Sequence, residues 1–194
     1  MNLIRKILLG IGMLTGLIII GTIIYALPAM VTLPSGPRSG IEELTIADAA
    51  KQIREDYPKG WQQIERARQL VGERMDYCYQ NAYDSYEKAF TRGLGFCQQE
   101  AHALAAILRE LGYDAWVVQS VKTRFEDGNI LGHSWVRVSW NGITKDIDPE
   151  LYDPETGALL FEPLGQVTEF STFFRIFSGW GSAAVNAHRY YFSE

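Results

Sequence analysis

The stretch Gly95-Phe96-Cys97-Gln98-Gln99-Glu100-Ala101 places a cysteine where a glycine turn opens into an apolar helical segment. A thiol at a helix N-terminus faces backbone N–H groups that have no partner within the helix, and it faces the positive end of the helix dipole. Both features favour the thiolate, which is the form of cysteine that attacks carbonyl carbon. The stretch therefore predicts a nucleophilic Cys97 at the start of a helix.

The first half of the chain has helical periodicity. The Cys97 helix should run to Leu111 and end at Gly112, a residue typical of helix C-termini. Thr45 and Asp48 have the spacing of a capping box, which predicts that another helix starts there and stops before the proline at position 58. The helices predicted ahead of Cys97 cover residues 45–56, 61–74 and 83–90.

The second half changes to alternating periodicity. Asn141-Gly142 is the strongest short-range hairpin signal in the chain. The predicted strands are 115–121, 134–140 and 143–148, with a loop over 124–132 between the first two. Helices followed by an antiparallel sheet indicate an α+β fold.

The two-residue turn at Asn141-Gly142 fixes which side chains of the hairpin face each other. Counting outward from the turn, Arg137 faces Asp146, and His133 is diagonal to Asp148 on the same face. Diagonal neighbours are about 7–8 Å apart, which an imidazole and a carboxylate can bridge. We therefore expect Asp148 to orient His133 and Asp146 to satisfy Arg137.

Cys97, His133 and Asp148 are the three parts of a Cys-His-Asp acyl-transfer site. The other histidines are given no catalytic role: His102 lies on another face of the Cys97 helix, and His188 lies near the end of the chain. No cysteine and histidine spacing is typical of a zinc site, and no glycine-rich loop precedes a helix to bind phosphate. We expect neither a metal nor a cofactor.

An uncharged apolar run extends from Ile7 to Leu27, directly after Arg5 and Lys6. About 20 apolar residues can span a bilayer as a helix, and preceding basic residues favour a cytoplasmic N-terminus. The sequence therefore predicts a single-pass membrane anchor with an extracytoplasmic domain. A cleaved signal peptide is the alternative because Ala26 and Ala29 are small, although its apolar segment is usually shorter.

The composition is that of a folded protein, with 47% hydrophobic and 21% charged residues among 194. A net charge of −5 and the lack of a basic stripe argue against nucleic-acid binding. We expect an anchor or signal segment over 1–30, a linker over 31–44 and one domain over 45–194.

Cys78 and Cys97 are the only two cysteines. In an oxidising compartment they could form a disulfide, which would make Cys97 structural. The histidine and aspartate downstream favour the catalytic interpretation instead, and Cys78 is expected to be a small buried residue.

Six short segments between about residues 60 and 150 occur in the order found in one known family: Gly95-Phe96-Cys97, Ala101, Leu111-Gly112-Tyr113, Val117-Val118, His133-Ser134-Trp135 and Asp148-Pro149. Together they resemble the transglutaminase-like superfamily, whose papain-like α+β core has a catalytic cysteine at a helix start and histidine and aspartate on neighbouring strands. The resemblance implies that Cys97 is the nucleophile, His133 the general base and acid, and Asp148 the orienting group. Gln99 stands where many relatives have an acidic or small residue.

The resemblance implies thiol-dependent acyl transfer on peptide or protein amides, with a thioester resolved by water or by an amine. The Cys97 N–H and a second donor would hold the oxyanion. Gln80 is the candidate donor by analogy with papain-like enzymes, and Trp61, Tyr77 and Tyr79 are others. The alternatives are an inactive, membrane-tethered module of the same fold that binds a peptide or partner, and a structural domain closed by the disulfide.

Residues 151–194 form an aromatic C-terminal extension beyond the core. Helical spacing relates Phe170, Phe173, Phe174 and Phe177, and Trp180 follows. This pattern predicts a helix that covers the sheet or the helical lobe. An interfacial helix beside the anchor, or a wall of the substrate cleft, are the alternatives.

Overall fold

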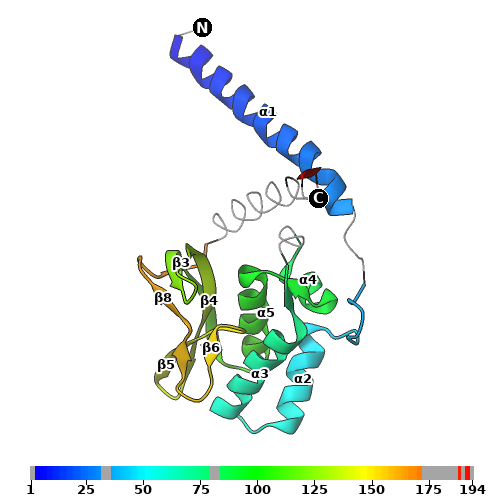
Figure 1. Cartoon of the computed structure of the whole chain (residues 1–194), viewed down its shortest axis with the longest axis vertical. Coiled ribbons are helices and arrows are strands. Elements are labelled where there is room, and N and C mark those ends of the chain that lie inside the picture. Colours follow the sequence, from blue (N-terminus) through cyan, green and yellow to red (C-terminus); the bar gives the residue numbers. More distant parts are fainter. Residues whose placement is uncertain (1–2, 32–35, 79–83, 172–187, 189–190, 193–194) are drawn as a thin grey trace.

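The computed structural model describes residues 3–31, 36–78, 84–171, 188 and 191–192. Helices α2 to α4 lie on one side of helix α5, and an antiparallel sheet lies on its other side (Figure 1). The helix bounds are α1 Leu3–Val31, α2 Ile46–Asp56, α3 Trp61–Arg74, α4 Tyr86–Arg92 and α5 Cys97–Glu110. The predicted α+β class is confirmed.

Local capping explains where the helices begin. The Thr45 hydroxyl oxygen accepts a hydrogen bond from the Asp48 N–H and so starts α2, as the capping-box spacing predicts. Helix α4 begins at Tyr86, three residues later than predicted, because Ser85 caps it. It ends at Gly93, whose φ of 77° suits glycine at a helix C-terminus.

The main sheet has the order β5-β4-β3-β8, and β9 also pairs with β3. Its strands are β3 Asp114–Phe125, β4 Ile130–Trp140, β5 Ile143–Ile147, β8 Phe161–Pro163 and β9 Thr168–Glu169. Two short pairs complete the strands described: parallel β1 Asp76–Tyr77 with β2 Leu94–Gly95, and antiparallel β6 Tyr152–Asp153 with β7 Ala158–Leu159.

The predicted loop over 124–132 is wrong in extent. Strand β3 continues to Phe125 because it pairs with β8, and β4 already begins at Ile130. The chain reverses between them at Gly128, which has a φ of 83°, and the Asp127 carboxylate accepts a hydrogen bond from the Asn129 N–H. This turn is short because the pairing with β8, far away in sequence, extends the strand.

The predicted hairpin register is confirmed. Arg137 pairs with Asp146 across β4 and β5, and Trp140 pairs with Ile143 beside the turn. Asn141 has a φ of 49° and Gly142 a φ of 77°, as a turn with two left-handed residues requires. The register therefore directs the side chains of His133 and Asp146 as the sequence predicts.

Helix α5 forms the centre of the core. Its small residues allow close approach to β3 and β4 on one side and to α2, α3 and α4 on the other. Its fully buried apolar side chains are Ala101, Ala103, Leu104, Ala105, Ile107 and Leu108. The first residue of α5 is thus held by a helix that is fixed from both sides.

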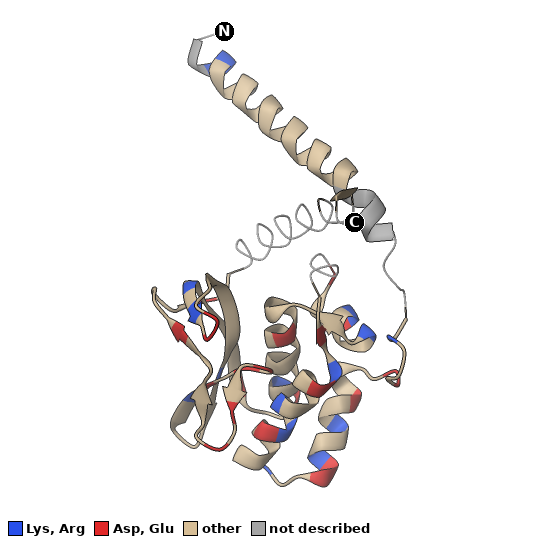
Figure 2. Ribbon diagram, in the orientation of Figure 1, with Lys and Arg blue, Asp and Glu red and all other residues tan. Residues whose placement is uncertain are grey.

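Helix α1 contains the predicted apolar segment, and residues Arg5–Tyr25 are long and apolar enough to cross a membrane. Figure 2 shows charged residues only at the start of the described part of this helix. Its apolar side chains, such as Leu17 and Ile24, are exposed.

The aromatic extension differs from the predicted helix at its first residue. Phe170 follows the edge strand β9, and its N–H donates a hydrogen bond to the Val117 carbonyl. Its ring packs edge-on against His102, with the ring centres 5.0 Å apart. Phe173, Phe174, Phe177 and Trp180 lie outside the described residues.

Candidate active site

His133 and Asp148 form a buried hydrogen-bonded pair. The Nε2 atom of His133 lies 2.8 Å from Oδ2 of Asp148, and the two residues are 8% and 2% exposed. The other carboxylate oxygen, Oδ1, accepts hydrogen bonds from the N–H groups of Glu150 and Leu151, at 3.0 and 2.7 Å. Asp148 is therefore fixed in orientation, and Nε2 of His133 is occupied by it.

Cys97 is the first residue of α5, at the position that the sequence predicts. Its side chain is free of any disulfide, and its interaction with His133 is one of the causes that raise the pKa of that histidine. Because Nε2 of His133 is held by Asp148, Nδ1 is the ring nitrogen left for another partner. The structure thus brings Cys97, His133 and Asp148 together from α5, from β4 and from the turn after β5.

The surroundings of His133 favour its protonated form. Burial alone would lower the pKa of His133, but the hydrogen bonds to Asp148 and Cys97, together with their negative charges, raise it to about 9. At neutral pH the imidazole is therefore held as a cation.

Gln99 shapes the N-terminus of α5. Its side-chain oxygen accepts a hydrogen bond from the Phe96 N–H at 3.3 Å, and its amide donates to the Asp84 carbonyl at 3.0 Å. The glutamine therefore makes the reverse hydrogen bond of a capping box, from the N-cap N–H to the third helical residue, at the helix start that carries Cys97. The departure from the family pattern at this position supplies a hydrogen bond rather than removing one.

Arg68 and Gly72 of α3 hold the backbone beside Asp148. The Arg68 guanidinium donates to the Pro149 carbonyl at 2.8 Å and pairs with Glu65 at 2.7 Å. One turn further along α3, a Cβ on Gly72 would lie 2.4 Å from the same Pro149 oxygen. The absence of a side chain at Gly72 therefore permits the close approach of this turn to the helix. Neither residue was singled out from the sequence.

Asp146 has the structural role that the register predicts. It accepts two hydrogen bonds from Arg137, at 2.5 and 2.8 Å, and a third from the Trp135 indole N–H at 3.0 Å. It is therefore separate from the His133 pair.

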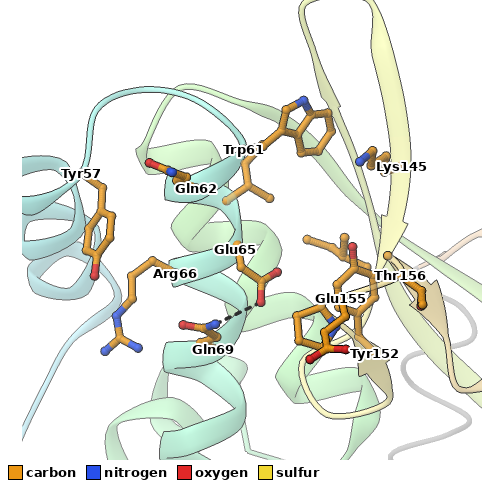
Figure 3. Close-up of a pocket in the computed structure, with 14 residues that line it drawn as sticks. Tyr57, Trp61, Gln62, Glu65, Arg66, Gln69, Lys145, Tyr152, Glu155 and Thr156 are labelled. Carbon is orange, nitrogen blue, oxygen red and sulfur yellow. Dashed lines mark hydrogen bonds between the residues drawn. The ribbon is translucent and has the colours of Figure 1, made fainter.

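Of the two candidate oxyanion donors that the structure describes, Tyr77 is the one that lines a pocket together with His133. Trp61 does not lie there: it starts α3 and lines a different pocket of about 630 Å³, with Lys145 above its ring (Figure 3). Tyr79 and Gln80 lie outside the described residues.

Cys78 is half-buried, not buried as predicted, and it is not paired with Cys97. Its N–H donates to the Gly95 carbonyl at 2.5 Å, continuing the pairing of β1 with β2. Cys78 is only half-buried because it follows β1, a strand at the molecular surface whose residues Asp76 and Tyr77 are exposed.

Glu100 is a buried acid that sequence reasoning missed. It is 3% exposed and lines the pocket beside His133. Burial, and then the charges of Glu150, Cys97 and Asp148, raise the pKa of Glu100 to about 10. It lies three residues after Cys97, on the apolar stripe of α5, so an acid in phase with that stripe was the available signal.

The raised pKa of Glu100 gives a prediction for stability. The folded protein holds a proton that the unfolded chain releases above pH 4.5, so the stabilising contribution of Glu100 is full below that pH and is lost towards pH 10. Glu100→Gln, which does not titrate, should gain stability relative to the parent by about 4–5 kcal/mol between pH 5 and pH 8.5, at about 1.4 kcal/mol per pH unit. Denaturant unfolding of both chains at the two pH values measures this gain. A gain of the same size in exposed Glu43→Gln, or none in Glu100→Gln, would contradict it.

The family model described as Transglutaminase-like superfamily matches residues 47–144. A search of the curated proteins found no match. Among solved structures, the chain is similar to a proposed cysteine protease from Cytophaga hutchinsonii (11% identity, TM-score 0.46, 75% of this chain and 53% of that one). It is also similar to the periplasmic domain of TgpA from Pseudomonas aeruginosa (20% identity, TM-score 0.40, 64% and 48%) and to a TGase (17% identity, TM-score 0.43, 54% and 31%).

The chain spans about half the length of the first two of these structures. The matched family segment covers half of this chain, and it includes Cys97, His133 and the helical and sheet elements on which they lie. The chain belongs to the Transglutaminase-like superfamily.

Proposed function

We propose that the protein is a cysteine-dependent enzyme that transfers acyl groups from peptide or protein amides. In this proposal Cys97 is the nucleophile, His133 is the general base and acid, and Asp148 orients His133. The observation that carries the proposal is the buried His133 side chain, whose Nε2 hydrogen-bonds Asp148 and whose pKa is raised by its interactions with Asp148 and Cys97. A purely binding module has no need of this arrangement.

The proposed first step starts from a thiolate–imidazolium pair of Cys97 and His133. The sulfur attacks the amide carbonyl, and the new C–S bond places the electron pair of the C=O bond on the oxygen. The Cys97 N–H lies at the first helical position, where the helix provides no acceptor, so it can donate to that oxyanion. Tyr77 remains a candidate for the second donor.

In the next step the C–N bond breaks, and His133 gives its proton to the departing amine. A thioester on Cys97 remains, and neutral His133 can then take a proton from the next nucleophile. Water as nucleophile releases a carboxylic acid, whereas an amine releases a new amide. The enzyme is thus a hydrolase or a transamidase according to which nucleophile reaches the thioester.

Alkylation tests the nucleophile directly. Iodoacetamide should modify Cys97 of the full-length protein, and Cys97→Ala should lose that modification, as read by peptide mass spectrometry. His133→Ala should slow alkylation of Cys97 by a factor on the order of 10², because the cation that holds the thiolate is gone. Cys78→Ala is the matched control, since it removes the other free thiol and should leave Cys97 labelling intact.

Modification of Cys78 but not of Cys97 would overturn the assignment and favour the inactive binding module. The reaction type follows from incubating the full-length protein with mixed peptides, with and without n-butylamine. Loss of ammonia, backbone cleavage and incorporation of the amine are separate mass changes, and all three should vanish in Cys97→Ala.

We propose further that α1 anchors the domain to a membrane, with the domain outside the cytoplasm. The apolar segment Arg5–Tyr25 and the basic residues Arg5 and Lys6 at its start support this placement.

A further inference from the structure

The pocket beside His133 has acidic and apolar walls. Its volume is about 440 Å³, and the described residues that line it include no lysine and no arginine. The acidic side chains are Glu100, Glu126, Asp127, Asp148 and Glu150, and the apolar and aromatic ones are Tyr77, Phe125, Leu131, Leu151 and Leu160. His133 and Asp148 balance each other as a pair, and the raised pKa of Glu100 keeps that carboxyl neutral. The uncompensated negative charge therefore comes from the exposed acids Glu126, Asp127 and Glu150, and it favours a cationic ligand.

Glu100 lies at the inner end of this acidic set. It is 3% exposed, and its Oε1 atom has no hydrogen-bond partner in the structure. A buried acceptor without a partner costs free energy, and a ligand that brings an N–H donor would recover part of that cost. Glu100 therefore offers an unused acceptor to whatever enters the pocket.

The other acids of the pocket differ in how they are engaged. Asp148 is fully used by His133 and by two backbone N–H groups. The Glu150 side chain is exposed, and within the described part of the chain it makes no ion pair. Glu100 and Glu150 are thus the two carboxyl groups that remain available to a ligand next to Asp148 and His133.

The cation is organic and not a metal ion. Within the residues that the structure describes, no three His, Cys, Asp or Glu side chains are grouped to hold a metal. The apolar lining, by contrast, suits an aliphatic arm that ends in a charged nitrogen.

We propose that this pocket binds a primary ammonium group of the substrate, which donates a hydrogen bond to Glu100 and is neutralised by Glu150. The proposal rests on the proposed acyl-transfer function, because it concerns what lies beside the reacting thiol. The ammonium group belongs either to the amide substrate that acylates Cys97 or to the amine that later receives the acyl group. Both sources share the same recognition chemistry.

Two thiol reagents that differ only in charge test the pocket. N-(2-aminoethyl)chloroacetamide carries a primary ammonium group, and N-(2-acetamidoethyl)chloroacetamide is its neutral counterpart. The measured quantity is the ratio of their alkylation rates at Cys97 in the full-length protein, divided by the same ratio for glutathione. We expect a corrected ratio of about tenfold in the parent, the size of one hydrogen bond to a charged group.

The variants locate the effect. Glu100→Leu, which removes the acceptor oxygen, and Glu150→Gln, which removes the charge, should each bring the corrected ratio to within about twofold of one. Glu43→Gln is the matched control, because it removes one charge from the exposed segment before α2 and should keep the parent ratio. Two separate pocket variants keep the test valid if one of them fails to fold.

The outcomes separate this proposal from the one it rests on. Two outcomes overturn the pocket assignment but leave the acyl-transfer function standing. One is a corrected ratio of one in the parent, and the other is a ratio that does not change in either pocket variant. No labelling of Cys97 by either reagent overturns the acyl-transfer function and this inference with it.

Two further measurements identify which substrate carries the ammonium group. A higher KM after acetylation of a peptide's amino groups identifies the amide substrate as its carrier. An incorporation rate for n-butylamine that falls in Glu150→Gln identifies the acceptor. Either result supports the pocket assignment. An unchanged KM after acetylation, together with an unchanged incorporation rate in Glu150→Gln, contradicts it.

Discussion

Replacement of Asp148 by Asn is expected to lower kcat/KM by a factor on the order of 10³ and to move the alkaline limb of the pH profile downward. The reason lies in the two oxygens of Asp148. Oδ1 accepts hydrogen bonds from the Glu150 and Leu151 N–H groups, so an asparagine must keep its only oxygen there. Its NH2 group then points at Nε2 of His133.

An NH2 group facing Nε2 forces His133 to accept a hydrogen bond where it now donates one. The imidazolium then loses the partner that stabilises it, and burial, which lowers the pKa of His133, is less opposed. In the parent the cation persists to about pH 9. In Asp148→Asn the limb should fall by about two pH units or more, towards or below the ordinary histidine value near 6.5.

Two measurements check this result: the pH dependence of Cys97 alkylation by iodoacetamide, and the pH dependence of peptide turnover. Asp146→Asn is the matched control, because it makes the same substitution two residues earlier, on β5, at a carboxylate bound to Arg137 and Trp135. It should leave the alkaline limb near that of the parent. Identical profiles for the two variants would contradict the orienting role of Asp148.

Gly72→Ala is expected to destabilise the fold by about 3 kcal/mol. The sign is unusual, because glycine to alanine inside a helix normally stabilises by about 1 kcal/mol. Here the added Cβ would lie 2.4 Å from the Pro149 carbonyl oxygen. That oxygen belongs to the backbone, so it cannot rotate away as a side chain could. The turn that carries Asp148 must move away from α3 to accommodate it.

Denaturant unfolding of the full chain measures the free energy, and the labelling rate of Cys97 reports the displaced Asp148. Gln62→Ala serves as the control, since it makes an alanine substitution at an exposed position of the same helix. That variant should change stability by less than about 0.5 kcal/mol. A Gly72→Ala protein as stable as the parent would show that the turn can shift freely.

The central part of the site could be predicted because its determinants are local. The Asn141-Gly142 turn sets the register by itself, and the register places His133 diagonal to Asp148. Likewise, the glycine turn before Cys97 marks the start of α5 without reference to the rest of the fold.

The parts that could not be predicted depend on contacts between distant segments. The extension of β3 requires β8, and the support of the Asp148 turn requires Arg68 and Gly72 of α3. Glu100 looks like an ordinary surface acid until α5 is enclosed on both sides. The periodicity of one segment gives no information on which distant segments it contacts.

The division of Cys97, His133 and Asp148 among α5, β4 and the turn after β5 has a consequence for biosynthesis. Cys97 is synthesised well before Asp148, and it lies outside the β4–β5 hairpin that brings His133 to Asp148. Until the hairpin has docked on α5, His133 has no fixed place beside the thiol, and the nascent chain carries an ordinary cysteine. If Cys97 reacts as proposed, the fold thus delays the appearance of a reactive sulfur until synthesis of the domain is nearly finished.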